Sequence, residues 1–385
     1  MNKENHYSLR ELVLYALKLG TTGFGGPVAL VGYMYRDLVE RRRWISDADY
    51  REGLTLAQIA PGPLAAQLAI YLGYVDYRIV GATLVGLAFV LPSFIMVVAL
   101  GWLYRLYGGL SWMQAVFYGI GAAVIGIITL SAYKLTLKTI GKRKLLWAIY
   151  LVSAASTAVT ESEFFLIILF GGVLVWFVEN PPFKFKALNS FTLFVFPAVI
   201  AGSQMTPRGA LLLNMSVFFA KAGSLVFGSG LAIIPALHGG AVNEYHWLTE
   251  RQFLDAVAVA MITPGPVVIT VGFIGFLVAG FAGACVAAAG TFLPCYLFTV
   301  IPAPYFKKYG KRPAVISFVD GVTAAAVGAI TGAVVVLGRR SLTDIPTIAI
   351  AVATGFILWK TKKIPEPVLI LLAAIIGLAL KWRFL

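Results

Sequence analysis

Residues 60–63 read Ala-Pro-Gly-Pro, and residues 263–266 read Thr-Pro-Gly-Pro, each beside long apolar runs. Proline removes a backbone donor and clashes with the preceding turn, and glycine costs about 1 kcal/mol relative to alanine, so each motif should interrupt a helix. In hydrocarbon, non-helical backbone survives only where protein or a watery cavity satisfies its polar groups. The two motifs therefore predict a matched pair of broken helices.

The composition places these helices in a membrane. Of the 385 residues, 59% are hydrophobic and 12% are charged, and the mean hydropathy is +0.86. Soluble domains are roughly half apolar and about a quarter charged. Apolar runs of about 18 residues or more recur from end to end, which is typical of transmembrane helices. We predict an all-α, polytopic helical bundle with room for roughly a dozen crossings.

The charged and metal-binding residue types narrow the function. The formal net charge of +14 lies in short Lys and Arg clusters between apolar runs, as is typical of cytoplasmic loops, so no nucleic-acid partner is expected. The two Cys and three His show no metal-ligand spacing. A membrane enzyme acting on lipid phosphates, which is one alternative, would need His with carboxylates or a metal cluster. We expect no catalytic residues, no metal and no cofactor.

An internal repeat relates the two halves of the chain. Adding 203, or locally 202, to a residue number in the first half finds its counterpart in the second. Duplicated bundles are common in secondary transporters, with the substrate site at the repeat interface. We assign residues 1–188 to the N-terminal repeat, 189–210 to a connecting segment and 211–385 to the C-terminal repeat. Matched pairs are Lys18 and Lys221, Phe24 and Phe227, Trp44 and Trp247, and Glu163 and Glu366.

A glycine motif precedes each Pro-Gly-Pro triplet. Residues 20–27 read GTTGFGGP, and residues 223–230 read GSLVFGSG. Glycine in membrane helices often serves close packing alone, but four interruptions paired across two repeats favour broken helices near the midplane. The N-terminus of a half-helix offers free N–H groups and a partial positive charge, which suits an oxyanion.

Charged residues inside apolar runs are candidates for function. Lys221 follows residues 211–220 of its run, about 15 Å deep at 1.5 Å per residue. Lysine at a helix centre costs about 2.5–3.5 kcal/mol, which favours a functional role. Lys18 is shallower and can also reach the interface. Asp320 is a candidate for a proton carrier or an ion pair, or it lies at the interface.

The basic clusters also bear on the orientation of the halves. If a weaker apolar stretch, 190–203, crosses the membrane, the halves are inverted and the Arg41–Arg43 loop lies outside, unless the first apolar run, 12–35, dips in and returns. We predict inverted halves. This choice makes four clusters cytoplasmic: Lys134–Lys144, Lys184–Lys186, Lys307–Arg312 and Lys360–Lys363.

Several short motifs in order carry a family resemblance. The FGGP of residues 24–27, the Trp-Ile-Ser of residues 44–46 and the APGP of residues 60–63, echoed by FGSG and TPGP in the second half, resemble the two-domain chromate ion transporters. The resemblance covers essentially the whole chain. It implies an inner-membrane carrier that exports chromate and confers chromate resistance, with duplicated, inverted halves. The halves are not identical at the proposed site, because Gly26 and Pro27 of the first half correspond to Ser229 and Gly230 of the second.

We predict that the four breaks converge on one site for a tetrahedral dianion and that the halves rock around it. Sulfate or another small anion is the alternative substrate, because sulfate and chromate are tetrahedral dianions of similar size. A homodimer in the lipid bilayer is compatible with the sequence. Gln67, Thr21, Thr22 and Ser224 add polar groups near the breaks. The candidate substrate-binding residues are Lys18, Phe24, Gly25, Gly26, Gln58, Pro61, Gly62, Pro63, Lys221, Gly228, Ser229, Thr263, Pro264, Gly265 and Pro266.

Overall fold

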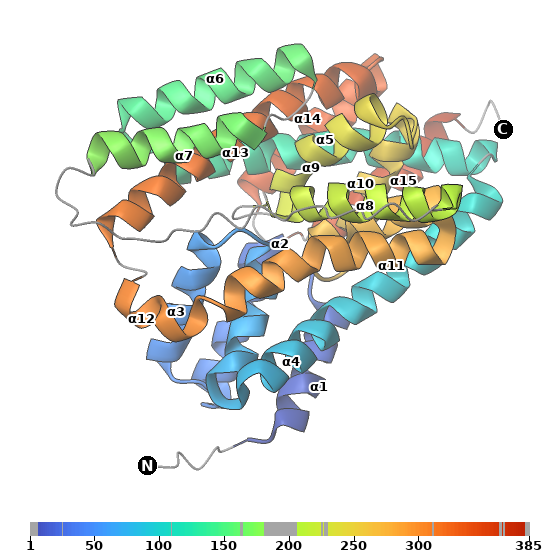
Figure 1. Ribbon diagram of the computed structural model, residues 1–385. Helices are drawn as coiled ribbons and strands as arrows, with labels where there is room; N and C mark the ends of the chain where they lie inside the picture. The colour runs from blue at the N-terminus through green and yellow to red at the C-terminus, as the bar shows by residue number, and fades with distance from the viewer. Residues whose placement is uncertain are drawn as a thin grey trace.

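The computed structural model describes residues 7–24, 26–108, 110–161, 165–180, 206–224, 226, 230–309, 312–361, 364 and 366–381. Within these ranges every regular element is helical (Figure 1), which confirms the predicted all-α bundle. The elements are α1 (Leu9–Thr22), α2 (Gly26–Met34), η1 (Tyr35–Arg41), α3 (Asp47–Ile59), α4 (Leu64–Tyr107), α5 (Ser111–Ile140), α6 (Lys144–Thr160), α7 (Phe165–Glu179), α8 (Pro207–Gly223), η3 (Gly230–Ile233), α9 (Ile234–His238), η4 (Gly239–Glu244), α10 (Glu250–Ile262), η5 (Val267–Ile269), α11 (Thr270–Val300), α12 (Ala303–Tyr309), α13 (Pro313–Ser341), α14 (Ile345–Lys360) and α15 (Glu366–Lys381).

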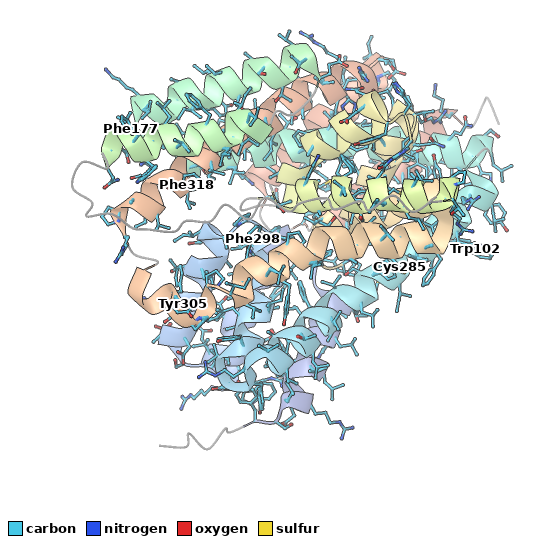
Figure 2. All side chains as sticks on the ribbon, in the orientation of Figure 1. Trp102, Phe177, Cys285, Phe298, Tyr305 and Phe318 are labelled. Atoms are coloured by element: carbon cyan, nitrogen blue, oxygen red, sulfur yellow. The ribbon has the colours of Figure 1, made fainter. Side chains whose placement is uncertain are left out.

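The outside of the bundle is apolar. Four helical stretches among the described residues are long and apolar enough to cross a membrane: Leu64–Tyr107, Ser111–Leu137, Val267–Phe306 and Pro313–Ser341. Large apolar side chains stand outward from the bundle (Figure 2), and Trp102, Phe177 and Tyr305 are 56%, 50% and 62% exposed. Such a surface is unfavourable in water and fits contact with lipid chains.

The first apolar run, 12–35, is not one crossing. It forms α1, with 14 residues, and α2, with 9, and α1 spans only about 21 Å against a hydrocarbon core of about 30 Å. Tyr7, at the start of α1, stacks on Trp44, beyond the end of η1, with ring centroids 5.0 Å apart. The run therefore enters the bundle and returns to the same side.

A second hairpin follows in each repeat, with the Pro-Gly-Pro triplet at its tip. Helix α3 leads to the first triplet, and the first arm of α4 (64–77) returns beside α3, where the Tyr71 hydroxyl donates to the Glu52 carboxylate at 2.8 Å. The chain reverses at Arg78, whose φ is 51°, so that the backbones of Gly73 and Gly81 touch. In the second repeat α10 and the first arm of α11 (270–278) repeat this hairpin, with the reversal at Gly280 and the contact between Gly275 and Gly283.

The direction of α5 and α13 shows that the repeats are inverted. Tyr118, near the start of α5, donates a 2.6 Å hydrogen bond to Asp344, just beyond the end of α13. Arg143, just beyond the end of α5, pairs with Asp320, near the start of α13, at 2.6 Å. The two helices occupy equivalent places in the repeats and run antiparallel. This confirms the predicted inversion. The stretch 190–203 lies outside the described residues.

The two ends of these helices define two faces of the bundle. The Arg143 face holds Arg143 and Asp320, and the Arg340 face holds Tyr118, Arg340 and Asp344. Basic groups also lie on the Arg143 face. Arg42 stacks on Trp44 beside Tyr7, whose hydroxyl donates to Asp76 at the end of the first arm of α4. Lys134 lies near Glu366, and Arg312 lies at the start of α13. Because the first run returns, the Arg41–Arg43 loop lies on the same side as Lys134, Arg143 and Arg312, as the positive-inside rule favours.

The repeats are also intertwined. Helix α5 of the first repeat packs mainly on α14 and α15 of the second, while α13 of the second packs mainly on α6 and α7 of the first. Figure 1 shows α6, α7 and α13 together as one layer above the long, diagonal α4 and α11. The 189–210 connection is described only from Thr206, and α8 already begins at Pro207.

Candidate functional site

The four breaks meet at one place in the molecule. The Gly62 N–H donates to the Val226 carbonyl oxygen at 2.5 Å, and the Gly265 N–H donates to the Gly23 carbonyl oxygen at 2.9 Å. Both the donors and the acceptors are 203 residues apart. Each Pro-Gly-Pro tip is therefore bonded to the glycine motif of the opposite repeat. We call the four residues Gly23, Gly62, Val226 and Gly265 the crossing.

Glycine is required at both tips, because of the backbone conformation and because a side chain would not fit. Gly62 has φ +144° and Gly265 has φ +95°, which side-chain-bearing L residues rarely adopt. A Cβ on Gly62 would lie 2.7 Å from Gln67 and 3.0 Å from the Cys295 sulfur, and a Cβ on Gly265 would overlap the Ser93 hydroxyl. Cys295 and Ser93 each belong to the repeat opposite the tip that they contact. Side-chain packing at the crossing therefore joins the two repeats, as the backbone hydrogen bonds do.

Helix N-termini point into the crossing from both repeats. Pro63 caps α4, and the first intrahelical bond there is from the Gln67 N–H to the Pro63 carbonyl oxygen at 3.0 Å. The preceding N–H groups, of Ala65 and Ala66, have no acceptor within their helix, although both residues are at most 2% exposed. Pro266 begins η5 in the same way. Buried backbone donors of this kind are suited to an anion.

Polar side chains line the crossing sparsely. Gln67 is fully buried, its Nε2 donates to the Pro61 carbonyl oxygen at 2.8 Å, and its Oε1 has no hydrogen-bond partner. The Thr263 hydroxyl donates to the Val259 carbonyl oxygen at 2.8 Å, within its own helix. Ser93 donates to the Gly20 carbonyl oxygen at 3.4 Å. Sequence reasoning missed Ser93 and Cys295; a polar residue directly after Pro92, inside an apolar helix, was the available signal.

Of the predicted site residues, both triplets, Pro61–Pro63 and Pro264–Pro266, and Thr263 lie at the crossing, and Gly26 begins α2 beside it. The side chains of Lys18, Gln58 and Lys221 are exposed, and Phe24 is 37% exposed, so these four do not join the buried groups. Gly25, Gly228 and Ser229 lie outside the described residues. Asp320 lies on the Arg143 face, paired with Arg143.

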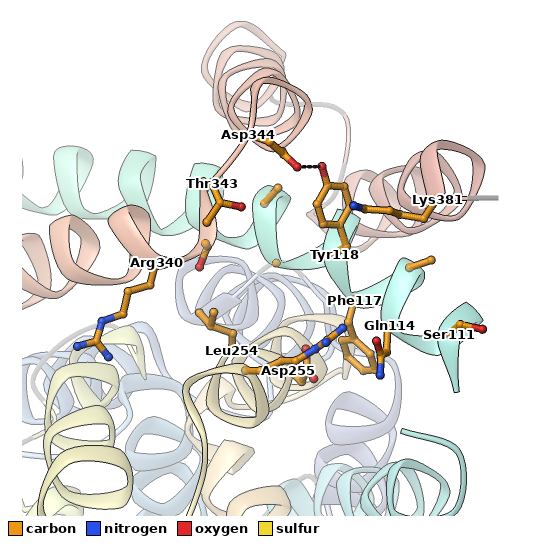
Figure 3. A pocket seen from close by; sticks show the side chains of 15 residues that line it. Ser111, Gln114, Phe117, Tyr118, Leu254, Asp255, Arg340, Thr343, Asp344 and Lys381 are labelled. Atoms are coloured by element: carbon orange, nitrogen blue, oxygen red, sulfur yellow. Dashed lines mark hydrogen bonds between the residues drawn. The ribbon is translucent and has the colours of Figure 1, made fainter. Parts of the chain in front are cut away.

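A separate cavity of about 560 Å³ opens near the Arg340 face, between α5, α10, the α13–α14 turn and α15 (Figure 3). Asp344 accepts from Tyr118 there, and Lys381 lies 4.7 Å from the Tyr118 ring. Burial alone would raise the pKa of Asp344, but hydrogen bonds from Tyr118 and Thr347 and the charge of Lys381 together lower it. Arg340 pairs with Glu161 and Glu250. Asp255 lines the same cavity from α10.

Comparison with known proteins identifies the family. The chain matches the chromate transporter family over residues 10–176 and again over 213–378. The chain belongs to the chromate transporter family. The double match agrees with the repeat in sequence and structure. As a member of this family, the protein is a membrane transporter and not an enzyme.

Three relatives match this chain over nearly the whole length of both proteins. A chromate transport protein of Cupriavidus metallidurans is 68% identical over 374 residues, which cover 97% of this chain and 93% of the relative. A probable chromate transport protein of Synechococcus elongatus is 65% identical over 376 residues, 96% and 95% of the two chains. A chromate transport protein of Pseudomonas aeruginosa is 31% identical over 390 residues, 97% and 92%. No solved structure matches the chain.

Proposed function

We propose that this protein exports chromate across the plasma membrane of a bacterium or archaeon and so confers chromate resistance. The observation that carries the proposal is the reciprocal bonding at the crossing, Gly62 to Val226 and Gly265 to Gly23. It brings two buried helix N-termini from inverted repeats to one place, which is where inverted-repeat transporters bind substrate. The names of relatives at 68% and 65% identity support chromate as the anion.

The proposed site binds the anion through backbone rather than through buried cations. The N–H groups of Ala65 and Ala66, and those at the start of η5, supply hydrogen bonds to oxyanion oxygens, with Gln67 beside them. Lys18 and Lys221 each lie five residues before the crossing in chain order. Because the repeats are inverted, the two lysines approach from opposite faces and make the potential along the path more positive.

The inverted repeats supply the two states that alternating access needs. One pair of hairpins connects each face of the bundle to the crossing, and the Gly62–Val226 and Gly265–Gly23 bonds link the two pairs. A state open to one face and a state open to the other are therefore related by the same symmetry as the repeats. The membrane potential then favours export. Each charge is worth about 2.3 kcal/mol per 100 mV, so a dianion leaving a negative interior gains about twice that amount.

The test is uptake of radiolabelled chromate by everted membrane vesicles, in which export appears as uptake. Vesicles containing the protein are expected to accumulate chromate, and collapse of the membrane potential is expected to abolish accumulation. Vesicles with Gly265→Ala, matched for inserted protein, serve as the control for the site. Uptake no greater than that of empty vesicles would contradict the proposal. Uptake of labelled sulfate in place of chromate would assign the alternative substrate.

A further inference from the structure

Asp255 is an acidic residue that the proposed chromate path does not use. It is 5% exposed, and Tyr104 donates a 2.7 Å hydrogen bond to one of its carboxylate oxygens. Burial disfavours the charged form of a carboxyl group, and one hydroxyl donor compensates only partly. Since Asp255 lines the 560 Å³ cavity, water can reach it from one side. A buried carboxyl beside an aqueous cavity is the arrangement from which a proton is readily bound and released.

The titratable and charged groups around Asp255 come from several elements that border the cavity, and Figure 3 shows most of the cavity-lining ones. Among the described residues, α11 contributes an aromatic ring, Phe273, which packs on Tyr104 at 5.5 Å between centroids. The positive groups are Arg251 on α10, Arg340 on α13 and Lys381 on α15, and they oppose protonation of Asp255. Asp344, before α14, is negative and favours it, and Tyr104 on α4 and Tyr118 on α5 are neutral hydroxyl groups.

The matching place in the first repeat is built differently. Glu52 lies 203 residues before Asp255, and its hydroxyl partner, Tyr71, comes from the same hairpin. The contacts Gly73–Gly81 and Gly275–Gly283 are 202 apart, which aligns Tyr71 with Phe273. The second hairpin therefore lacks this hydroxyl, and Tyr104 of the first repeat supplies it. The hydroxyl bonded to Asp255 therefore comes from the other repeat, whereas the hydroxyl bonded to Glu52 comes from its own.

This bond connects the cavity to the crossing. Asp255 lies on α10, whose C-terminus leads directly into Thr263 and the Pro264–Pro266 triplet. Tyr104 lies on the long second arm of α4 (79–107), and its ring contacts both Phe117 and Phe273. Protonation of Asp255 removes the charged acceptor of the Tyr104 hydroxyl and so loosens α10 from α4. The second hairpin can then move relative to the first repeat.

We propose that Asp255 is the proton-binding residue of this transporter and that a proton enters through the cavity as the oxyanion leaves. Arg42, Lys134, Arg143 and Arg312 lie on the Arg143 face, and Arg340 on the cavity side is paired with Glu161 and Glu250, so charge favours the Arg143 face as cytoplasmic and the cavity side as external. An inward proton and an outward dianion both move down a membrane potential that is negative inside. The inference rests on the proposed export function, and it makes the exporter a proton antiporter.

The test uses the purified full chain in proteoliposomes, with the membrane potential clamped and a pH-sensitive dye inside. A chromate gradient is expected to drive protons in the opposite direction through the wild type. In Asp255→Asn this proton movement is expected to be lost while chromate exchange continues. Glu52→Gln, the equivalent change in the first repeat, is the matched control and is expected to keep proton movement.

A second variant tests the hydroxyl. Tyr104→Phe keeps the carboxyl but removes its donor to the ionised form, so the pH dependence of chromate flux is expected to move to higher pH. Chromate flux without proton movement in the wild type would overturn the inference and leave the export function standing. Proton movement retained in Asp255→Asn would also overturn it. No chromate flux in the wild type would refute both proposals.

Discussion

In the first repeat the hairpin of α3 and α4 bonds its own acidic residue, Glu52, through Tyr71, whereas in the second repeat Asp255 is bonded by Tyr104 of the other half. The backbones of the two hairpins are nevertheless equivalent, because both tips donate to the opposite glycine motif. The comparison teaches that the duplication preserved the geometry of the breaks while the polar side chains diverged. Variants at equivalent positions should therefore agree at the tips and differ away from them.

The largest expected effect is at the tip glycines. Gly62→Ala and Gly265→Ala each force an L residue to positive φ, at about 1–2 kcal/mol, and place a methyl group against Gln67 or Ser93. Both are expected to abolish chromate flux in vesicles. Gly32→Ala, where an added Cβ meets open space, is the control and should retain flux. If only one tip variant were inactive, the equivalence of the hairpins would be broken.

A severalfold loss of flux is expected from Lys221→Ala and, in the same direction, from Lys18→Ala. Each lysine precedes the crossing by the same number of residues, and removing either lowers the positive potential along the path. Arg208→Ala, at the exposed start of α8, controls for charge alone. Normal export by Lys221→Ala, with normal membrane expression, would remove the lysines from the proposed path.

A smaller effect, larger in the first repeat than in the second, is expected from Gln67→Leu. The change leaves the Pro61 carbonyl without its donor in a buried position, at about 1–3 kcal/mol, and should raise KM for chromate. The residue 203 positions later, Thr270, bonds only within its own turn, so Thr270→Val should change KM less. KM values from initial rates decide the comparison, and equal effects would contradict it.

The smallest effect is expected at the Arg143 face. Arg143 and Asp320 are 41% and 31% exposed in their side chains, and exposed pairs are worth less than about 1 kcal/mol. Asp320→Asn is expected to leave chromate flux and proton movement near wild type, and a double-mutant cycle with Arg143→Ala should give a coupling in that small range. Loss of proton movement in Asp320→Asn would transfer the proton role from Asp255 to Asp320.

Sequence alone predicted the elements that local chemistry determines. The repeat, the helix breaks at the Pro-Gly-Pro triplets and the inverted halves follow from glycine, proline and charge patterns, and all appear in the structure. Hydropathy does not determine the return of the first run at Gly23, because two short helices and one kinked span have the same hydropathy.

The remainder depends on contacts between distant segments. Nothing local to Gly62 or Val226 indicates that they bond each other. The cavity beside Asp255 is assembled from α5, α10, the α13–α14 turn and α15, with no common motif. Ser93 and Cys295 are at the crossing because each helix lies against the other repeat's tip. Such residues become visible only when the chain is folded.

The exchange at the crossing has a consequence for how the chain is made. Gly62 emerges from the ribosome long before Val226, and α5 emerges before its partners α14 and α15. The first half must therefore wait in the bilayer with buried backbone donors unpaired until the second half is inserted. A gene split between the repeats should yield two unstable pieces when each is expressed alone. Expressed together, they should recover a working transporter, since each carries the bonds that the other lacks.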